Sequence, residues 1–274
     1  AILDEMEREF GIQPNTNVMN AFIHCLANVE DDEASTLKAE KAIQRMEEMH
    51  ESGESGIRPD VVTYTCLITA YAKSNMADAG VRAEEVLFRM EAMAETFPGL
   101  APNVRSYNAA LAAWARSRVN GAANRGQILL ERMEDMYSNG NEKVKPDVYS
   151  YTTTIHAWAR SSEKGSTQRA ARLLARMEKL SETDPSLKPN MHTYTIVINA
   201  WAKSGESDAP EKAQHLLDKM ERSDSAKPNI SSYTSAIDCI AKSRRPNAAR
   251  NADEMLSYVK EKYEQGERRI KPNT

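Results

Sequence analysis

The chain has 274 residues with a formal net charge of −4, and 28% of its residues are charged. No apolar run approaches the roughly 20 residues of a membrane span and no secretory signal is visible, so we expect no membrane partner. Cys25, Cys66 and Cys239 are too scattered for a disulfide framework, and we expect small buried thiols. No catalytic constellation stands out, so the sequence predicts neither an enzyme within these residues nor a bound metal or cofactor.

From the N-terminus, residues 1–15 resemble the end of a second helix, and a block that recurs six times then follows. The block begins at residues 16, 61, 104, 148, 191 and 230, so its copies lie 45, 43, 44, 43 and 39 residues apart. Each copy directly follows Pro-Asn or Pro-Asp. Self-similarity at a fixed period of about 20–50 residues marks a repeat protein. The predicted repeats are 16–60, 61–103, 104–147, 148–190, 191–229 and 230–273.

Each block predicts an amphipathic helix, as in VVTYTCLITAYAKS at 61–74. Counted from the residue after Pro-Asn or Pro-Asp, position twelve is always Ala, position eight is always branched and apolar, and position four is Tyr in five copies. At about 100° per residue these positions lie on one side of a helix. We expect that side to be packed inside the protein.

A second helix follows in every copy, and it has an apolar residue at one recurring position, which we call its landmark. The Pro-Asn or Pro-Asp pair then supplies a stop and an N-cap for the next first helix. Each repeat is therefore predicted to be a helical hairpin, and the six hairpins to stack into one continuous, all-α, right-handed solenoid. Because both ends fall within a repeat, we expect the chain to be part of a longer protein. The landmarks are Met46, Met90, Met133, Met177, Met220 and Val259.

Function should come from the opposite side of the first helices. Position five is only Asn or Thr, the closing residue of each repeat is only Asp or Asn, and position thirteen is basic in five of six copies. Stacking would turn these residues into ladders suited to base edges and phosphates, although the same residue types are also ordinary helix caps. The predicted phosphate-binding residues are Lys73, Arg116, Arg160, Lys203 and Lys242.

The charges are unevenly distributed along the repeats. The first fifteen positions of the six blocks contain eight of the 36 basic residues but only two of the 40 acidic residues. The rest of the chain therefore contains 28 basic and 38 acidic residues. We therefore expect a net positive first-helix surface and an acidic convex side. Such segregation lets an acidic protein attract a polyanion to one face.

The repeats resemble pentatricopeptide repeats, an organellar RNA-binding family. The first helix VVTYTCLITAYAKS, the second helix AEEVLFRMEAM and the terminal Pro-Asn are similar to the family's V-T-Y-N-x-L-I, E-x-F-x-x-M and P-D/N elements. The resemblance covers essentially the whole chain, although these repeats are longer than the family's usual unit. It implies binding of single-stranded RNA in a mitochondrion or chloroplast, in RNA processing, stability or translation. We expect a monomer.

In that family, position five and the closing residue of a repeat together select one base, running 5′ to 3′ from the N-terminus. Asn with Asp resembles a uracil reader and Thr with Asn an adenine reader, which implies a preference for 5′-UAUAAA-3′. At position two, where the family places a Val between bases, Val62, Arg105, Tyr149 and His192 are the expected stacking residues. The pairs are Asn20/Asp60, Thr65/Asn103, Asn108/Asp147, Thr152/Asn190, Thr195/Asn229 and Thr234/Asn273.

A second function stays open, that of a protein-binding helical scaffold similar to tetratricopeptide arrays. The ladder of Asn and Thr favours RNA, whereas the overall acidity and the irregular position two favour the scaffold. Protein partners on the acidic convex face are a further expectation.

Overall fold

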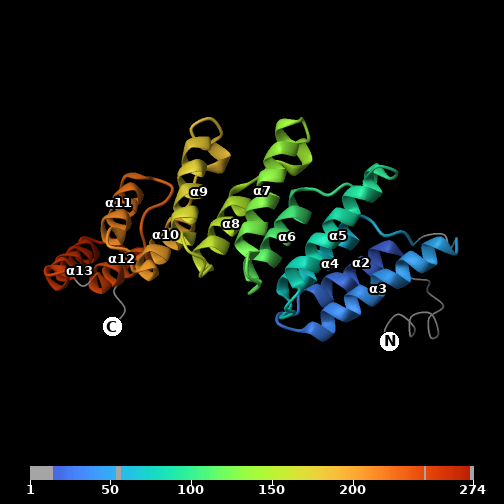
Figure 1. The fold of residues 1–274 in the computed structure, drawn as a ribbon, viewed down its shortest axis with the longest axis horizontal. Coiled ribbons are helices and arrows are strands. Elements are labelled where there is room, and N and C mark those ends of the chain that lie inside the picture. The colour runs from blue at the N-terminus through green and yellow to red at the C-terminus, as the bar shows by residue number, and fades with distance from the viewer. Residues whose placement is uncertain (1–14, 54–56, 244, 272–274) are drawn as a thin grey trace. The chain divides into compact units, whose positions relative to one another are not determined.

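The computed structural model describes residues 15–53, 57–243 and 245–271, which form α-helices joined in pairs by short loops (Figure 1). No strand occurs among these residues, so the predicted all-α class is confirmed. The chain divides into two compact units, Ala1–Pro146 and Asp147–Thr274. In the part of the chain that the structure describes, each unit has three helical hairpins.

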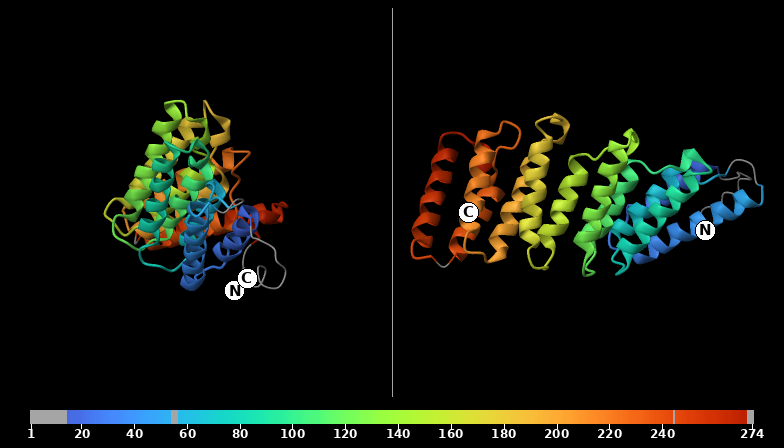
Figure 2. Two further views of the ribbon diagram at one scale, coloured as in Figure 1. Left: turned by 90° about the vertical axis from the view of Figure 1, so that its right-hand side faces the viewer. Right: turned by 45° about the horizontal axis from the view of Figure 1, so that its top comes forward.

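In the first unit, three first helices lie side by side and each is followed by a second helix (Figure 2). The central first helix packs against the first helices before and after it, and the second helices of the first two hairpins pack against both their own and the next first helix. This is the stacking of a solenoid. The helices are α2 (Thr16–Ala27), α3 (Glu33–Glu51), α4 (Val61–Lys73), α5 (Ala79–Ala94), α6 (Val104–Arg116) and α7 (Ala122–Ser138).

The second unit repeats this arrangement, with α10 packed between α8 and α12. Its second helices again contact the first helices on either side, α9 with α10 and α11 with α12. Both units are therefore built by the same hairpin packing. The helices are α8 (Val148–Arg160), α9 (Ser166–Leu180), α10 (Met191–Ser204), α11 (Ala209–Arg222), α12 (Ile230–Lys242) and α13 (Ala248–Glu264).

Every first helix begins directly after the Asn or Asp that closes the preceding repeat. In α4, for example, Asp60 has an extended backbone, and its side chain accepts hydrogen bonds from the N–H groups of Val62 and Thr63. The predicted N-caps are thus confirmed, including Asn15 before α2. A cap of this kind stabilises a helix by about 1 kcal/mol.

A buried apolar residue lies three positions upstream of each described closing residue from Asp60 to Asn229. In most repeats it ends a short 3-10 helix, and it is fully or almost fully buried. Because this anchor and the cap flank the proline, the start of each first helix is fixed from both sides. The 3-10 helices are η1 (Pro98–Leu100), η2 (Glu142–Val144), η3 (Pro185–Leu187) and η4 (Arg268–Ile270).

The packed side of the hairpins consists of the residues that the periodicity predicts. Each landmark methionine is 0% exposed and Val259 is 1% exposed. Ala159 at position twelve of α8 is half-buried, and the largest departures are in the last first helix, where Ile237 at position eight is only half-buried and Ala241 at position twelve is exposed. No described first helix follows α12, which is why these two residues lack cover.

The cysteines follow the same logic, and one expectation was wrong. Cys66 and Cys239 are buried as predicted, and burial raises the pKa of the Cys239 thiol to about 11, which keeps it protonated. Cys25 is exposed. It occupies the same position of α2 as Cys239 does in α12, but no described helix precedes α2, whereas α10 covers α12.

A polar contact at position four joins successive hairpins. The Tyr64 hydroxyl donates to Glu47 Oε1 at 2.8 Å, and Arg89 of the next second helix pairs with the same oxygen at 2.8 Å. Burial, followed by the hydrogen bond to Glu47, raises the pKa of Tyr64 well above its usual value, so this tyrosine stays a donor.

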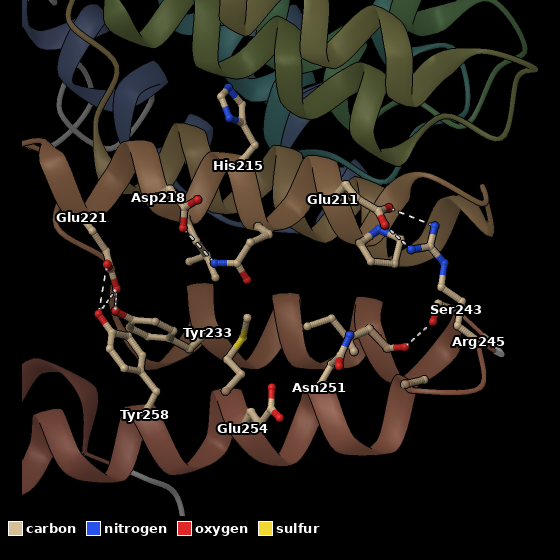
Figure 3. A pocket seen from close by; sticks show the side chains of 16 residues that line it. Glu211, His215, Asp218, Glu221, Tyr233, Ser243, Arg245, Asn251, Glu254 and Tyr258 are labelled. Atoms are coloured by element: carbon tan, nitrogen blue, oxygen red, sulfur yellow. Dashed lines mark hydrogen bonds and ion pairs between the residues drawn. The ribbon is translucent and has the colours of Figure 1, made fainter.

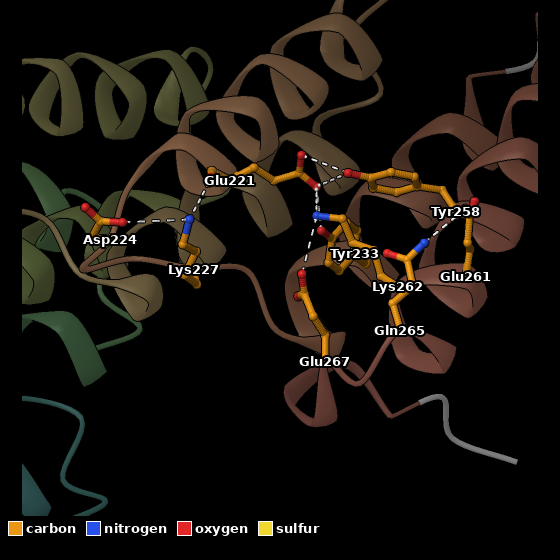
Figure 4. Close-up of polar contacts among 9 residues, drawn as sticks. All are labelled: Glu221, Asp224, Lys227, Tyr233, Tyr258, Glu261, Lys262, Gln265 and Glu267. Carbon is orange, nitrogen blue, oxygen red and sulfur yellow. Dashed lines mark hydrogen bonds and ion pairs between the residues drawn. The ribbon is translucent and has the colours of Figure 1, made fainter.

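The last such junction, in the second unit, uses more donors. Tyr233, Tyr258 and Lys262 all donate to Glu221 (Figure 4). Burial alone would raise the pKa of Glu221, but these hydrogen bonds outweigh it and the pKa is lowered. The carboxylate is therefore held ionised between α11 and α13.

The described residues contain neither a membrane-spanning helix nor a cluster of metal ligands. None of their helices combines the length and the apolar character needed to cross a membrane. Nowhere among them do three His, Cys, Asp or Glu side chains gather as a metal ion would require.

Candidate nucleic-acid interface

The two predicted base-reading residues of a repeat meet where one first helix adjoins the next. In the first repeat they touch directly, because Asn20 Nδ2 donates to Asp60 Oδ1 at 3.1 Å. The hydroxyl of Thr63 donates to Asn20 Oδ1 at 2.6 Å. Both ends of the Asn20 amide are thereby bonded, and its orientation is fixed.

Where position five is threonine, a hydroxyl at position three of the following repeat lies between the pair. In the second repeat, Thr65 Oγ1 lies 2.8 Å from Ser106 Oγ, which accepts the backbone N–H of Asn103 at 3.5 Å. Neither predicted residue needs to contact the other, because Ser106 connects them.

The second unit shows the same arrangement twice. Thr195 Oγ1 lies 2.8 Å from Ser232 Oγ, which lies 3.1 Å from Asn229 Oδ1. One repeat earlier, Thr152 Oγ1 lies 2.9 Å from Thr193 Oγ1, which is 3.1 Å from Oδ1 of the closing Asn190. Four of the six predicted pairs are thus brought together within their units.

In each of the other two pairs, the two residues do not both lie among the described residues of one unit. Asn108 is 9% exposed on α6 of the first unit, whereas Asp147 belongs to the second unit. Thr234 is exposed on α12 and its partner Asn273 lies outside the described residues.

Capping uses one terminal atom of each closing residue and leaves the other. Oδ1 of Asn103 accepts the N–H groups of Arg105 and Ser106, at 2.9 and 3.3 Å, while its Nδ2 has no partner among the described residues. Oδ1 of Asp60 likewise accepts its cap bonds, and Oδ2 stays without a partner in the same part of the structure. Asn therefore presents a donor where Asp presents an acceptor.

The position-five threonines, unlike the closing asparagines, can only accept hydrogen bonds from a ligand. Thr65 donates to the Val61 carbonyl at 2.6 Å, and Thr195 to the Met191 carbonyl at 2.8 Å. A hydroxyl has one proton, so these side chains only accept from a ligand. A Thr/Asn pair thus offers an acceptor beside a donor.

The predicted stacking residues point into solvent. Val62 is 50% exposed and Tyr149 54% exposed, large values for side chains with so much apolar surface. Arg105 and His192 are exposed as well. Each stands two residues after a closing residue, in the first turn of its helix.

The five predicted phosphate-binding cations differ in availability. Lys73 donates to Asn28 Oδ1 at 2.8 Å, Arg116 pairs with Asp31 at 2.8 Å and Lys242 pairs with Asp238 at 2.7 Å. Arg160 and Lys203, both in the second unit, have no partner among the described residues. They are the cations best placed to take a phosphate.

A histidine lies near these two cations. Partial burial, and then the charges of Arg160, His192 and Lys203, lower the pKa of His156 below its ordinary value. The basic groups of Arg160, His192 and Lys203 add to the effect of burial and lie on the surface of α8 and α10. Such a surface attracts anions.

The residues at position three were missed by the sequence reasoning. In the five later copies this position is always hydroxylated, which was readable as a capping pattern. The contact with the preceding repeat was not readable, because it joins residues about 40 apart. The residues are Thr63, Ser106, Ser150, Thr193 and Ser232.

The second unit also has a groove of about 680 Å³ between α11 and α13, with α12 as its floor (Figure 3). Its walls carry Glu211, Asp218, Glu221 and Glu254 against a single Arg245. None of the predicted RNA-binding residues lines it, so the acidic groove and the candidate interface are separate surfaces.

Comparisons with known proteins agree with the repeat assignment. The model of the pentatricopeptide repeat domain matches residues 46–117 and 133–204, which is 144 of the 274 residues. No curated protein matches the chain.

Among solved structures, the chain is similar to the pentatricopeptide repeat protein PPR10 in complex with an 18-nt psaJ RNA element, at 18% identity and a TM-score of 0.47 over 94% of this chain and 37% of that one. PPR10 from maize is a second match, at 20% identity and a TM-score of 0.39 over 99% and 41% of the two chains. The chain thus spans less than half the length of these proteins.

Proposed function

This chain belongs to the pentatricopeptide repeat family, and we propose that it is a sequence-selective module for single-stranded RNA that reads one base per repeat. The observation that carries the proposal is the shared geometry of position five and the closing residue. At each described junction, capping fixes one terminal atom and leaves an unpartnered donor or acceptor beside the position-five side chain.

The pairs match the edges of the bases they are proposed to read. Adenine presents an N6–H donor beside the N1 acceptor, which complements the acceptor of Thr195 and the Nδ2 donor of Asn229. Uracil presents the O4 acceptor beside the N3–H donor, which complements the second Nδ2 proton of Asn20 and Oδ2 of Asp60. Recognition of splayed-out bases by such edge contacts is the usual mode for single-stranded RNA.

Hydrogen-bond polarity alone separates amino bases from keto bases. Cytosine resembles adenine in this respect and guanine resembles uracil, so the size of the base has to complete the choice. Threonine is shorter than asparagine and leaves more room, which favours a purine opposite Thr and a pyrimidine opposite Asn. The proposed order is therefore 5′-UAUAAA-3′ across repeats 16–60 to 230–273.

Exposed side chains at position two complete the site. We expect the side chains at position two to stack between successive bases, namely Val62, Arg105, Tyr149 and His192. Stacking on the rings of Tyr149 and His192 should contribute about 1–3 kcal/mol per base. Arg160 and Lys203 would contact phosphates, with the three paired cations contributing less. We further propose that the module acts in an organelle, in RNA processing, stability or translation, and that the six repeats work as a monomeric array.

Binding to short labelled RNAs tests the proposal. We expect UAUAAA to bind more tightly than UACCCC, and the preference to persist at two salt concentrations. The double variant Thr195→Asn with Asn229→Asp should prefer UAUAUA over UAUAAA. Asn139→Asp, an exposed change outside the interface, is the matched control and should leave the preference unaltered.

Two results would contradict the proposal. Equal affinity for UAUAAA and UACCCC would remove base reading, and the absence of any RNA binding would favour the alternative of a scaffold for an extended peptide.

A further inference from the structure

We propose that the hydroxyl at position three of the following repeat is a specificity-determining group, because it positions both base-reading side chains of the repeat before it. This inference rests on the proposed function. It assigns part of the reading of each base to the neighbouring repeat, through Thr63, Ser106, Thr193 and Ser232 at the four described junctions.

Burial sets these hydroxyls apart from ordinary surface caps. Thr63, Ser106, Thr193 and Ser232 are all 0% exposed. Each of these hydroxyls lies within 2.9 Å of the position-five side chain of the preceding repeat. The contacted atom is a threonine hydroxyl in three junctions and the amide oxygen of Asn20 in the fourth. A buried polar group of this kind is costly to leave unpaired, so its bonds define one arrangement.

The protons at the fifth repeat can be assigned in only two ways. The Thr195 proton goes to the Met191 carbonyl or to Ser232 Oγ, both 2.8 Å away. The Ser232 proton goes correspondingly to Thr195 Oγ1 or to Asn229 Oδ1. In both cases Thr195 has no proton left for a base, and Oδ1 of Asn229 faces inward.

The consequence is a fixed polarity. With the hydroxyl present, Thr195 only accepts and Asn229 offers Nδ2. Without it, the Thr195 side chain keeps only the Met191 carbonyl and the Asn229 side chain keeps only the N–H of residue 232, so both side chains are held less firmly. A Thr195 side chain that rotates off the carbonyl can donate to the O6 acceptor of guanine as well as accept from the N6–H of adenine. The position-three hydroxyl thereby contributes to the choice between adenine and guanine.

The test is Ser232→Ala in the full chain, read as the ratio of affinities for UAUAAA and UAUAGA. We expect the ratio to fall about tenfold, the effect of losing one well-formed hydrogen bond. The ratio for UAUAAA and UGUAAA, read by Thr65, should stay unchanged in the same variant. Ser232→Thr should keep the selectivity, since Thr193 and Thr63 occupy the equivalent position in other repeats.

Ser235→Ala is the matched control. Ser235 is 6% exposed and donates to Asn199 Oδ1 at 2.7 Å, so it also joins α12 to α10, but it has no hydrogen bond to Thr195 or Asn229. If Ser232→Ala does not fold, Ser106→Ala answers the same question at the second base, with UGUAAA as the competitor.

The outcomes separate the two proposals. No preference for UAUAAA over UAUAGA in the unaltered chain would overturn base reading at this repeat, and with it the inference. A preference that Ser232→Ala preserves, or that Ser235→Ala reduces equally, would overturn the inference alone.

Discussion

The Tyr194 hydroxyl donates to Glu178 Oε1 at 2.8 Å, and this contact joins two successive hairpins of the second unit. Lys219 donates to the other carboxylate oxygen at 2.7 Å. The same three roles recur in Tyr64, Glu47 and Arg89 of the first unit. Stacking is therefore directed by polar contacts on the second-helix side as well as by apolar burial.

Removing the Tyr194 hydroxyl should weaken this junction. We expect Tyr194→Phe to lower the free energy of unfolding by about 1 kcal/mol, because Glu178 keeps Lys219 but loses a buried donor. Urea unfolding measures the change. Tyr149→Phe is the control, since Tyr149 is 54% exposed; equal effects of the two variants would show that the contact contributes nothing.

A second prediction concerns the close approach of α5 to Trp114. A Cβ added at Gly80 would lie 2.6 Å from Trp114 Cε3, so Gly80→Ala should destabilise the chain although alanine favours a helix by about 1 kcal/mol. Overpacking of about 1–3 kcal/mol should exceed this gain. Thermal unfolding is the measurement. Gly99→Ala, where nothing lies within 4 Å, should be neutral, and a stabilised Gly80→Ala would refute the prediction.

The lowered pKa of Glu221 predicts a specific acid sensitivity. A carboxylate whose pKa is lower in the folded than in the unfolded protein stabilises the fold above its ordinary value of 4.5, and this contribution is lost as the pH falls through the folded value. We expect Glu221→Gln to lose less stability than the unaltered chain as the pH is lowered from 7 through 4.5 to 3, measured by urea unfolding. Glu264→Gln, an exposed change, should lose as much as the unaltered chain. Equal losses in all three would contradict the assignment.

The unequal availability of the cations makes a prediction about salt. Lys203→Gln should reduce the slope of log affinity for UAUAAA against log salt by about 0.7, the value for one phosphate contact on a single strand. Lys242→Gln should reduce it less, because Lys242 already pairs with Asp238 at 2.7 Å. Titrations at several salt concentrations compare the two slopes. Equal reductions would mean that RNA displaces Asp238 at no cost.

The sequence predicts those features of the fold that depend on near neighbours. The first helices start where the Pro-Asn or Pro-Asp pairs place them, because an N-cap acts within three residues, as Asp60 does on Val62 and Thr63. The packed stripe follows from periodicity for the same reason. The exposed Cys25 was mispredicted because its burial depends on a neighbouring helix and not on its own.

The candidate site depends more on contacts between repeats. Arg116 is paired with Asp31, 85 residues away, and no local pattern shows that this cation is occupied while Lys203 is not. The hydroxyl of Ser232 looks like an ordinary capping residue until Thr195 is placed beside it. Residue types at the interface were thus readable from the sequence, but their hydrogen-bond partners were not.

The closing residue belongs to two repeats at once, and Asp and Asn serve almost equally well as N-caps. Exchanging one for the other replaces an outward acceptor by an outward donor and leaves the start of the next helix in place. If these atoms read bases, the preferred base at a given repeat can drift by a single substitution without a loss of folding stability. Target preference could then diversify over evolutionary time while the scaffold stays under unchanged selection.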